Sequence, residues 1–533
     1  MPDDTSSSKR PNVLFIITDQ HRADHVGFMD NNVVQTPNLD ALAARGTVFE
    51  RAWVSNPVCM PNRSTLVTGR MPSSHGVITN DRSLDWGVNT YVRRFRAAGY
   101  RTGLLGKSHL QNGISRLTSR DSELERAASD PWPDGWNELE FAEHYLPQDG
   151  LGHDVEHSTF DWPDDFYGFD TAELSLNHGA AVEGHHYQWA IERGARHDDL
   201  VVPQTADNPK ARGGDPWWQV YDPPYGEEFH SSSFVADRTI DFIEGAAAEG
   251  SPWLAWASFP DPHHPFTPPG QWYDRHDPDD IELPATFDDP MDGAPGFLKW
   301  IQQRSVHDMG NWVDLIGATS PEVTRAAIAA NYGTIEMIDD RIGQILAAIE
   351  RLGQTDDTIV VFTADHGDMM GDHHLLLKGM MHYRGCTQVP MVIADPRRSP
   401  GRTTSLISSV DLPSTLLEMC DIDRYHGMQG VSQLPVLDDP TASVRDAVLI
   451  EDDIDMALPP MFPTSIRTLI TPTHRYSRYT TGEDQLYELG TDDDERTNLS
   501  DTHPELRAEM TVQLADTMMA HANKAGGVFA SAK

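Results

Sequence analysis

The sequence predicts an α/β fold: one large, mixed but mainly parallel sheet sandwiched by helices, followed by a small C-terminal α+β domain. Four short apolar runs bounded by turn residues predict the sheet, and they lie at 13–18 (VLFIIT), 102–105 (TGLL), 254–259 (LAWASF) and 358–363 (TIVVFT). Continuous apolar runs of this length are typical of strands covered on both faces. Segments with helical periodicity lie between the runs, and strands that alternate with helices form a layered α/β sheet.

The helices that cover this sheet show start and stop signals. We expect a first helix over 39–45 and a second, short helix over 61–68, each followed directly by a glycine. The longest helix is expected to begin after Ser320, as the N-cap, with Pro321 in its first turn. Its apolar residues keep a helical spacing as far as Gly353, which ends it.

Two changes of pattern divide the chain. Residues 111–250 are rich in Asp, Pro, Trp, His and Gly, and we expect long loop insertions there, which commonly carry specificity. We expect a large α/β domain over 1–430 and a small domain of antiparallel sheet and helix over 431–533. The expected elements of the small domain are strands at 447–450, 465–470 and 474–479 and a helix at 504–523.

The charge of the chain excludes two classes of partner. It has 82 Asp and Glu against 41 Lys and Arg, a formal net charge of −41. Binding of nucleic acid needs clustered basic residues, and an anionic membrane repels an acidic surface, so neither partner is expected. An anionic substrate would need a local cluster of positive charge inside this acidic chain.

The expected location is cytoplasmic. Residues 13–18 form too short an apolar run for a signal peptide, and no stretch approaches the roughly 20 apolar residues of a membrane span. The three cysteines, Cys59, Cys386 and Cys420, cannot form a disulfide framework, which suits a reducing compartment. The sequence leaves the oligomeric state open, a homo-oligomer included.

Polar residues follow each of the four predicted strands. In open α/β sheets, ligands bind at these carboxyl ends of the strands. Asp19 and Gln20 follow the first strand, and Asp365 and His366 follow the fourth. Their oxygen and nitrogen atoms are suited to one divalent cation, Ca²⁺ or Mn²⁺, better than to a thiolate zinc site. The alternative is that Asp and Gly only terminate strands, but the other two strands also run into GKSH (106–109) and DPHHP (261–265).

Cys59 is the candidate nucleophile. It lies just before the helix expected over 61–68, where free N–H groups and the helix dipole favour an anion. Arg63, one turn into that helix, adds positive charge, so a thiolate at residue 59 would be activated. The alternative is a buried structural cysteine, which is the interpretation we give to Cys386 and Cys420.

These residues together resemble a known family. Cys59-x-Pro61-x-Arg63 followed by Thr68-Gly69-Arg70 resembles the signature of type I sulfatases of the alkaline phosphatase superfamily. Gly106-Lys107-Ser108-His109, Pro262-His263-His264-Pro265 and Asp365-His366-Gly367-Asp368 are similar to further elements of that family and occur in its order. The resemblance implies an alkaline-phosphatase-like fold and a maturase that oxidises Cys59 to Cα-formylglycine.

The metal-binding residues depart from the commonest pattern of the family. Asp19-Gln20 replaces a double Asp, and Asp365-His366 replaces Asp-Asn. This combination resembles the branch of choline sulfatases and phosphonate monoester hydrolases. Lys107 and His109 are both present and favour sulfate esters. We therefore expect hydrolysis of a small-molecule sulfate monoester, with phosphonate monoester or phosphodiester hydrolysis as the first alternative and an inactive metal-binding relative as the second.

The resemblance also implies a role for each residue. The hydrated formylglycine, a gem-diol, attacks sulfur with help from the metal, and positive side chains hold the sulfate oxygens. His263 or Lys378 protonates the leaving oxygen, and His109 removes a proton from the second hydroxyl to expel sulfate. The residues expected to act in this way are Cys59, Arg63, Lys107, His109, His263 and Lys378, with Asn80 and His264 as further substrate contacts.

Overall fold

The computed structural model describes residues 10–80, 82–111, 165–200, 212–213, 217–304, 319–454 and 460–522. An eight-stranded mixed sheet forms its centre, in the order β11-β2-β10-β9-β1-β8-β4-β5. The five strands from β9 to β5 are parallel to one another, and β10 runs antiparallel to both β9 and β2. The strands are β1 (Asn12–Thr18), β2 (Thr47–Phe49), β4 (Arg101–Gly106), β5 (Thr171–Leu174), β8 (Trp253–Ser258), β9 (Thr358–Ala364), β10 (Val392–Ala394) and β11 (Gly401–Thr403).

The four predicted strands are confirmed as the centre of this sheet. In β1 every residue is buried, and Phe15 lies in register between Trp256 of β8 and Val361 of β9. Alternate side chains of a strand point to opposite faces, so β1 contributes to two cores. Val13, Phe15 and Ile17 pack into one core, and Leu14 and Ile16 pack into the other.

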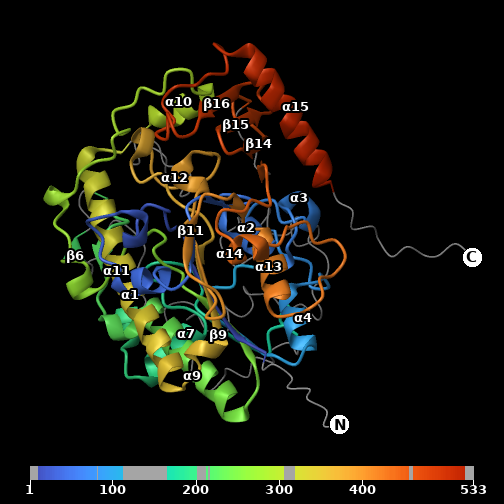
Figure 1. Ribbon diagram of the computed structural model, residues 1–533. Coiled ribbons are helices and arrows are strands. Elements are labelled where there is room, and N and C mark those ends of the chain that lie inside the picture. The colour runs from blue at the N-terminus through green and yellow to red at the C-terminus, as the bar shows by residue number, and fades with distance from the viewer. Residues whose placement is uncertain are drawn as a thin grey trace, which may run out of the picture.

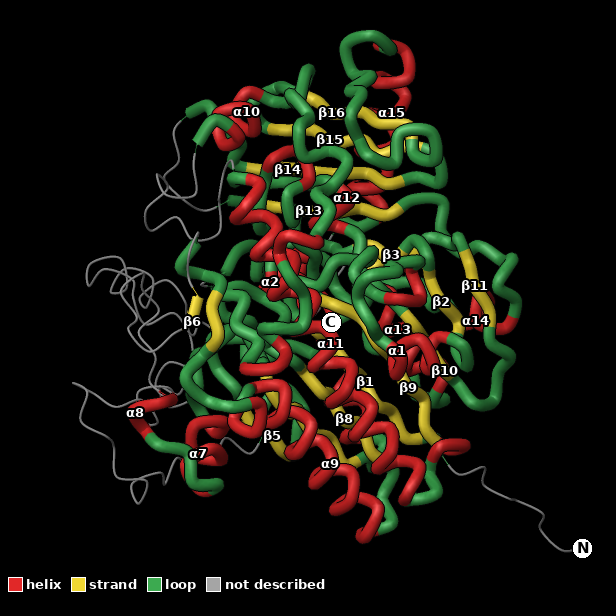
Figure 2. Tube along the Cα trace, turned by 90° about the vertical axis from the view of Figure 1, so that its left-hand side faces the viewer, coloured by secondary structure: helices red, strands yellow, loops and turns green. Residues whose placement is uncertain are grey.

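Helices cover both faces, as the sequence predicts. One face is covered by α1 (Pro37–Ala43), α7 (His185–Glu192), α9 (Ser231–Glu249) and α11 (Pro321–Arg351). Figure 2 shows α9 and α11 in front of the central strands. The other face is covered by α2 (Cys59–Thr68), α4 (Tyr91–Ala97) and α13 (Asp411–Met419). The expected N-cap of α11 is confirmed, because the Ser320 side chain accepts a hydrogen bond from the Val323 N–H at 3.2 Å.

The C-terminal region forms a separate four-stranded antiparallel sheet. Its strands β13 (Val448–Asp453), β14 (Ser465–Ile470), β15 (His474–Tyr479) and β16 (Asp484–Glu488) pair in chain order, and α15 (Pro504–Ala520) packs on them. Figure 1 shows this sheet and α15 at one end of the molecule, opposite α9. The strand β16 was absent from the prediction because the segment DQLYE contains only two apolar residues.

Strand β13 connects the C-terminal sheet to the start of α2. The Glu451 N–H donates to the Ser55 carbonyl at 2.9 Å, and the Asn56 side chain donates back to the Glu451 carbonyl at 2.6 Å. The Glu451 carboxylate accepts hydrogen bonds from the N–H and the hydroxyl of Ser73 at 2.9 and 3.1 Å. The edge of the small sheet therefore fixes the segment that leads into Cys59.

The interpretation of residues 111–250 as loop insertions is wrong for much of its second half. Strand β5 joins the main sheet beside β4, and α9 is one of its principal covering helices. Four residues (TAEL) are too few to show a strand period, and the serine-rich start of α9 hides its helical pattern. Residues 112–164 lie outside the described part of the chain.

Short elements complete the described fold. They are β3 (Ala52–Trp53), β6 (Arg212–Gly213), β7 (Tyr221–Asp222), β12 (Ile407–Ser408), α3 (Pro72–His75), α8 (His197–Leu200), α10 (Gly296–Gln302), α12 (Arg384–Thr387) and α14 (Leu434–Asp438). Within the described ranges, no helix combines the length and the apolar character that crossing a membrane requires.

Candidate active site

The carboxyl ends of four neighbouring strands bring the candidate residues together. Asp19 follows β1, Lys107 follows β4, His263 follows β8, and Asp365 follows β9. Backbone hydrogen bonds continue past the strand ends and hold these segments side by side: the Asp19 N–H donates to the Asp261 carbonyl at 3.1 Å, and the Asp365 N–H donates to the Thr18 carbonyl at 3.1 Å. All four side chains are buried.

Four residues present their ligand atoms to one point. Single atoms of Asp19, Cys59, Asp365 and His366 all lie within 4.8 Å of one another. Nε2 of His366 lies 3.1 Å from Cys59 Sγ, 3.4 Å from Asp19 Oδ1 and 3.6 Å from Asp365 Oδ1. Two carboxylates and an imidazole suit a hard divalent cation, and an oxygen in place of Sγ would complete a mixed O/N set. We call these four residues, with Arg63, the metal side of the site.

The charges of the metal side are suited to a cation. Burial, then the negative charge of Asp19, raises the pKa of Asp365. Burial also raises the pKa of Asp19, but Lys107 and His263 outweigh it and hold that pKa well below its ordinary value. Burial and Lys378 lower the pKa of His366, but Asp365 and Cys59 raise it to about 10. A divalent cation would relieve the repulsion between the two carboxylates.

Arg63 fixes both carboxylates of the metal side. Its Nε donates to Asp365 Oδ2 at 2.7 Å, and its Nη2 lies 3.4 Å from Asp19 Oδ2. Its Nη1 donates to the Ser258 hydroxyl at 2.8 Å and to the Lys107 carbonyl at 3.1 Å. The Arg63 side chain is 1% exposed, so its donors are engaged with the protein. Arg63 therefore contacts both carboxylates directly, and the contact to sulfate oxygens that the resemblance implies stays a prediction.

Gln20 lies at the border of the metal side. Its N–H donates to Asp365 Oδ1 at 3.1 Å, and its side-chain oxygen accepts from Lys378 Nζ at 2.9 Å. Its side-chain nitrogen lies 2.5 Å from Asp368 Oδ2 and 3.1 Å from His264 Nδ1. His264 therefore orients Gln20. Asp368 is a site residue that sequence reasoning missed, although it is the last residue of the quoted DHGD motif.

Cys59 is the first residue of α2, so the helix begins two residues earlier than expected. Asn80 lies beside it, because its Oδ1 accepts a hydrogen bond from the Met60 N–H at 3.1 Å. Cys59 is 1% exposed, and Lys378 Nζ lies 3.3 Å from Sγ. Burial and Asp19 raise the pKa of this thiol, but Lys107 and Lys378 outweigh them and hold it well below its ordinary value.

The surroundings of Cys386 and Cys420 differ from those of Cys59 in their effect on the thiol pKa. Both are buried and unpaired, as Cys59 is. Burial raises the pKa of Cys386 well above its ordinary value and raises that of Cys420 to about 12. Only Cys59, among the three cysteines of the chain, has surroundings that favour a thiolate, which supports the structural interpretation of the other two.

Basic side chains form a second group beside the metal side, which we call the substrate side: Lys107, His109, His178, His263 and Lys378. Lys107 Nζ contacts Asp19 Oδ2, and Lys378 Nζ contacts His263 Nε2. Nδ1 of His109 is buried and has no hydrogen-bond partner among the described residues. Burial, then Lys107, lowers the pKa of His109 to about 3, which favours its neutral imidazole.

His178 is a second residue that sequence reasoning missed. Its ring stacks on that of His263, with centroids 3.7 Å apart and planes at 16°. Its Nε2 contacts Lys107 Nζ and lies 3.6 Å from Asp19 Oδ2. The signal that could have found it is Asn177-His178-Gly179 at the end of β5, the same strand-end position that identified the others.

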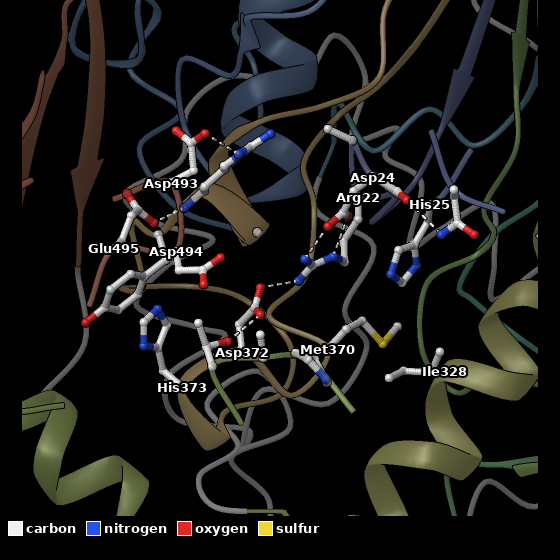
Figure 3. A pocket seen from close by; sticks show the side chains of 18 of the residues that line it. Arg22, Asp24, His25, Ile328, Met370, Asp372, His373, Asp493, Asp494 and Glu495 are labelled. Carbon is white, nitrogen blue, oxygen red and sulfur yellow. Dashed lines mark hydrogen bonds and ion pairs between the residues drawn. The ribbon is translucent and has the colours of Figure 1, made fainter. Parts of the chain in front are cut away.

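A separate, acidic cavity of about 310 Å³ lies beside the metal side. Arg22 stands in it between Asp24 and Asp372, each at 2.7 Å, and donates to the Asp368 carbonyl at 3.0 Å (Figure 3). Asp493, Asp494 and Glu495 of the C-terminal region line its other wall. This acidic lining distinguishes the cavity from the lysine- and histidine-rich group around Cys59, which is suited to an anion.

Comparison with known proteins decides the family. Residues 11–422, most of the chain, match the family described as Sulfatase. This chain belongs to the sulfatase family. Residues 371–524 of the sulfatase also match the region described as N-sulphoglucosamine sulphohydrolase, C-terminal. The family and the alkaline-phosphatase-like fold that the sequence predicts are thereby confirmed.

The sulfatase is similar to several named relatives over nearly its whole length. It is 26% identical to an arylsulfatase of Clostridium perfringens, covering 92% of this chain and 90% of the relative. It is 24% identical to a choline-sulfatase of Rhizobium meliloti, covering 92% and 83%. Its fold matches the crystal structure of a phosphonate monoester hydrolase of Agrobacterium radiobacter with a TM-score of 0.74 and 23% identity, covering 96% of each chain.

Proposed function

We propose that this sulfatase hydrolyses a small-molecule sulfate monoester to an alcohol and sulfate, with residue 59 acting as formylglycine. The observation that carries the proposal is the position of Cys59 at the start of α2, where Sγ lies 3.1 Å from a ligand atom of His366 and 3.3 Å from Lys378 Nζ. In the matured enzyme an oxygen of residue 59 would take the place of Sγ. That oxygen would belong to the metal side and lie next to Lys378 of the substrate side.

The metal side would hold one divalent cation, Ca²⁺ or Mn²⁺. Asp19, Asp365 and His366 are its proposed ligands, with Gln20 at its border. The cation supplies Lewis-acid activation of the nucleophile and neutralises charge on the sulfate oxygens. Arg63 keeps both carboxylates in place through direct hydrogen bonds.

The substrate side would bind the sulfate group and move protons. Lys107 and Lys378 place ammonium groups near residue 59, where they would neutralise charge that develops in the transition state. Lys378 Nζ contacts His263 Nε2, so this pair would protonate the leaving oxygen. His109 would take the proton that releases sulfate, because it makes a side-chain hydrogen bond with Cys59 and its Nδ1 has no partner among the described residues.

The test has two parts. Mass spectrometry of the peptide that contains residue 59, from protein made together with a formylglycine-generating maturase, should show the mass of formylglycine. The matured protein should then hydrolyse p-nitrophenyl sulfate, and a panel of choline, aryl and sugar sulfates should identify the preferred ester. An unmodified thiol in active protein would contradict the proposal.

The second candidate function is hydrolysis of phosphonate monoesters or phosphodiesters by the same nucleophile. The pairs Asp19-Gln20 and Asp365-His366 favour it, because they resemble that branch of the superfamily. Kinetics on p-nitrophenyl sulfate and p-nitrophenyl phenylphosphonate separate the two. A higher kcat/KM on the phosphonate would reverse the order. The cytoplasmic location, the maturase and a homo-oligomeric state stay predictions from the sequence.

A further inference from the structure

One loop connects the two sides of the active site. It runs from Asp368, two residues after the proposed ligand His366, to Lys378 of the substrate side. The Met369 N–H donates to the Leu377 carbonyl at 2.8 Å and closes the neck of the loop. Beyond this neck the loop lines the acidic cavity (Figure 3). The contacts at the neck therefore decide where the chain delivers Lys378.

The Asp368 carboxylate lies inside this neck. Its Oδ1 accepts hydrogen bonds from the N–H groups of Met370 and Leu377 at 2.8 and 2.9 Å. Its Oδ2 accepts one from the side-chain nitrogen of Gln20 at 2.5 Å. Asp368 is fully buried, and the three proposed metal ligands are not among these partners. The carboxylate thus binds the loop that ends at Lys378 and the amide of Gln20.

Leu377, the residue before Lys378, has a conformation that leucine rarely adopts. Its φ is 66°, in the left-handed region, which strains a residue that carries a side chain. Asp368 accepts its N–H, and its carbonyl accepts from the Met369 N–H at 2.8 Å and from Cys386 Sγ at 3.4 Å. A strained residue persists only where the surrounding structure holds it. The Asp368 carboxylate therefore helps to fix the backbone that leads into Lys378.

The other partner of Asp368 binds the ammonium group of Lys378. Lys378 Nζ donates to Gln20 Oε1 at 2.9 Å. It also lies 3.3 Å from Cys59 Sγ and contacts His263 Nε2. An ammonium group can only donate, so the amide oxygen of Gln20 faces Lys378 and the amide nitrogen faces Asp368. One carboxylate thus holds the backbone before Lys378 and the amide that receives its ammonium group.

We propose that Asp368 is a positioning residue for Lys378, and that its carboxylate sets the place of the ammonium group beside residue 59 and His263. The inference rests on the proposed function, in which Lys378 and His263 protonate the leaving oxygen. A catalytic group misplaced by about 1 Å costs about 10²-fold in rate even though the group itself is retained. Loss of the Asp368 carboxylate should therefore lower the rate while the metal stays bound.

Two substitutions at residue 368 test the contacts. Asp368→Ala removes all of them, so kcat on p-nitrophenyl sulfate should fall by about 10- to 100-fold. Asp368→Asn keeps an oxygen that can accept from Met370 and Leu377, and it loses only the contact to Gln20. Its kcat should fall by less than about tenfold. Elemental analysis should find the metal content of wild type in both variants, because the carboxylate does not contact the proposed ligands.

A double-mutant cycle shows whether Asp368 acts through Lys378. Lys378→Ala removes the ammonium group, so adding Asp368→Ala to it should change kcat by less than about threefold. The loss in Asp368→Ala alone should also be larger for phenyl sulfate than for p-nitrophenyl sulfate, because phenolate is the poorer leaving group. A residue that only stabilises the fold would move neither readout. If Asp368→Ala does not fold, the cycle with Asp368→Asn decides, and its loss should likewise vanish in the Lys378→Ala background.

The matched control is Asp339→Ala. Asp339 is also buried and accepts two backbone N–H groups, those of Asn38 and Leu39 at 3.1 and 2.8 Å, at the start of α1. Its loss should lower Tm and leave kcat as in wild type, because these contacts lead to no residue of the active site. Thermal unfolding of every variant sets the temperature at which the kinetics compare folded proteins.

Four results would overturn the inference. They are wild-type kcat in Asp368→Ala, equal losses in the Ala and Asn variants, an undiminished loss in the Lys378→Ala background, and a loss of metal that parallels the loss in kcat. A crystal structure of Asp368→Ala gives a readout without activity, because Lys378 Nζ should have left Gln20 and residue 59. An unmoved Lys378 would contradict the inference as well.

Failure of the proposed function is distinguishable from failure of the inference. A preference of wild type for p-nitrophenyl phenylphosphonate would overturn the proposed function, and the double-mutant cycle would then be read on that ester.

Discussion

The metal side and the substrate side of the active site are held in different ways. Asp19, Asp365 and His366 on the metal side are 0% exposed, and Arg63 binds both carboxylates. On the substrate side, His178 is partly exposed, and Nδ1 of His109 has no partner among the described residues. The protein thus completes the metal side with its own hydrogen bonds, while the substrate side keeps polar groups for a ligand to satisfy. Substitutions on the metal side should therefore lower metal binding together with activity. Substitutions on the substrate side should lower activity and leave the metal content unchanged.

The largest effect is expected at the centre of the metal side. Asp365→Ala removes a proposed ligand and leaves Arg63 without its main partner, so bound metal should be lost and kcat should fall by at least about 10³-fold. Elemental analysis and kinetics on p-nitrophenyl sulfate measure the two effects. Asp356→Ala, an exposed acid in η8 (Thr355–Asp357), is the matched control. Full metal content with activity within tenfold of wild type would show that Asp365 is not a ligand.

A substitution on the substrate side should separate activity from metal binding. Lys107→Ala removes an ammonium group from the proposed sulfate site, so kcat/KM should fall by about 10²- to 10³-fold. Metal content should not fall, because Lys107 competes with the cation for the charge of Asp19. Lys299→Ala on α10 controls for loss of a lysine elsewhere. Loss of metal in Lys107→Ala would erase the distinction between the two sides.

Arg63 should stabilise the metal side by holding its two carboxylates in place. Arg63→Lys keeps the charge but cannot reproduce the forked contacts to Asp365, Asp19 and Ser258. We expect metal affinity to weaken by about 10- to 100-fold, as for other residues that orient metal ligands. Activity should return largely at saturating metal. Activity that stays low at full metal occupancy would indicate that Arg63 contacts the sulfate group itself.

The smallest effect is expected behind the metal side, where His75 on α3 lies 3.1 Å from the Thr65 hydroxyl of α2. Burial, then Arg70, lowers the pKa of His75 to about 3. Below pH 6.5 the unfolded chain binds a proton that the folded protein excludes, so stability falls as the pH falls. Between pH 7 and pH 5, this residue alone should lower the free energy of unfolding by about 2 kcal/mol.

Denaturant unfolding at pH 7 and pH 5 measures this contribution of His75 to the free energy of unfolding. In His75→Gln the loss of stability between pH 7 and pH 5 should be smaller by about 2 kcal/mol. The exposed His503, just before α15, offers the control His503→Gln, which should leave the pH dependence of wild type unchanged. An unchanged pH dependence in His75→Gln would place the acid-sensitive groups elsewhere.

The central strands and the residues that follow them could be predicted from the sequence. Four apolar runs identified the central strands, and the residues that follow them identified most of both sides of the site. His178 was missed because β5 has only four residues, too short for a period to emerge. The contacts of Arg63 with Asp19 and Asp365 could not be predicted either, because charge alone does not tell which carboxylates a guanidinium will contact.

The contact between β13 and the segment before Cys59 has a consequence for synthesis of the chain. Glu451 is made 451 − 59 = 392 residues after Cys59. At about 5–20 residues per second, roughly 20–80 s pass before the ribosome supplies the strand that binds Ser55 and Asn56. During that interval the segment around residue 59 lacks its last partner, whereas in the folded protein Cys59 is buried. Under the proposed function, this interval is the time in which the maturase can act before β13 binds the segment that leads to Cys59.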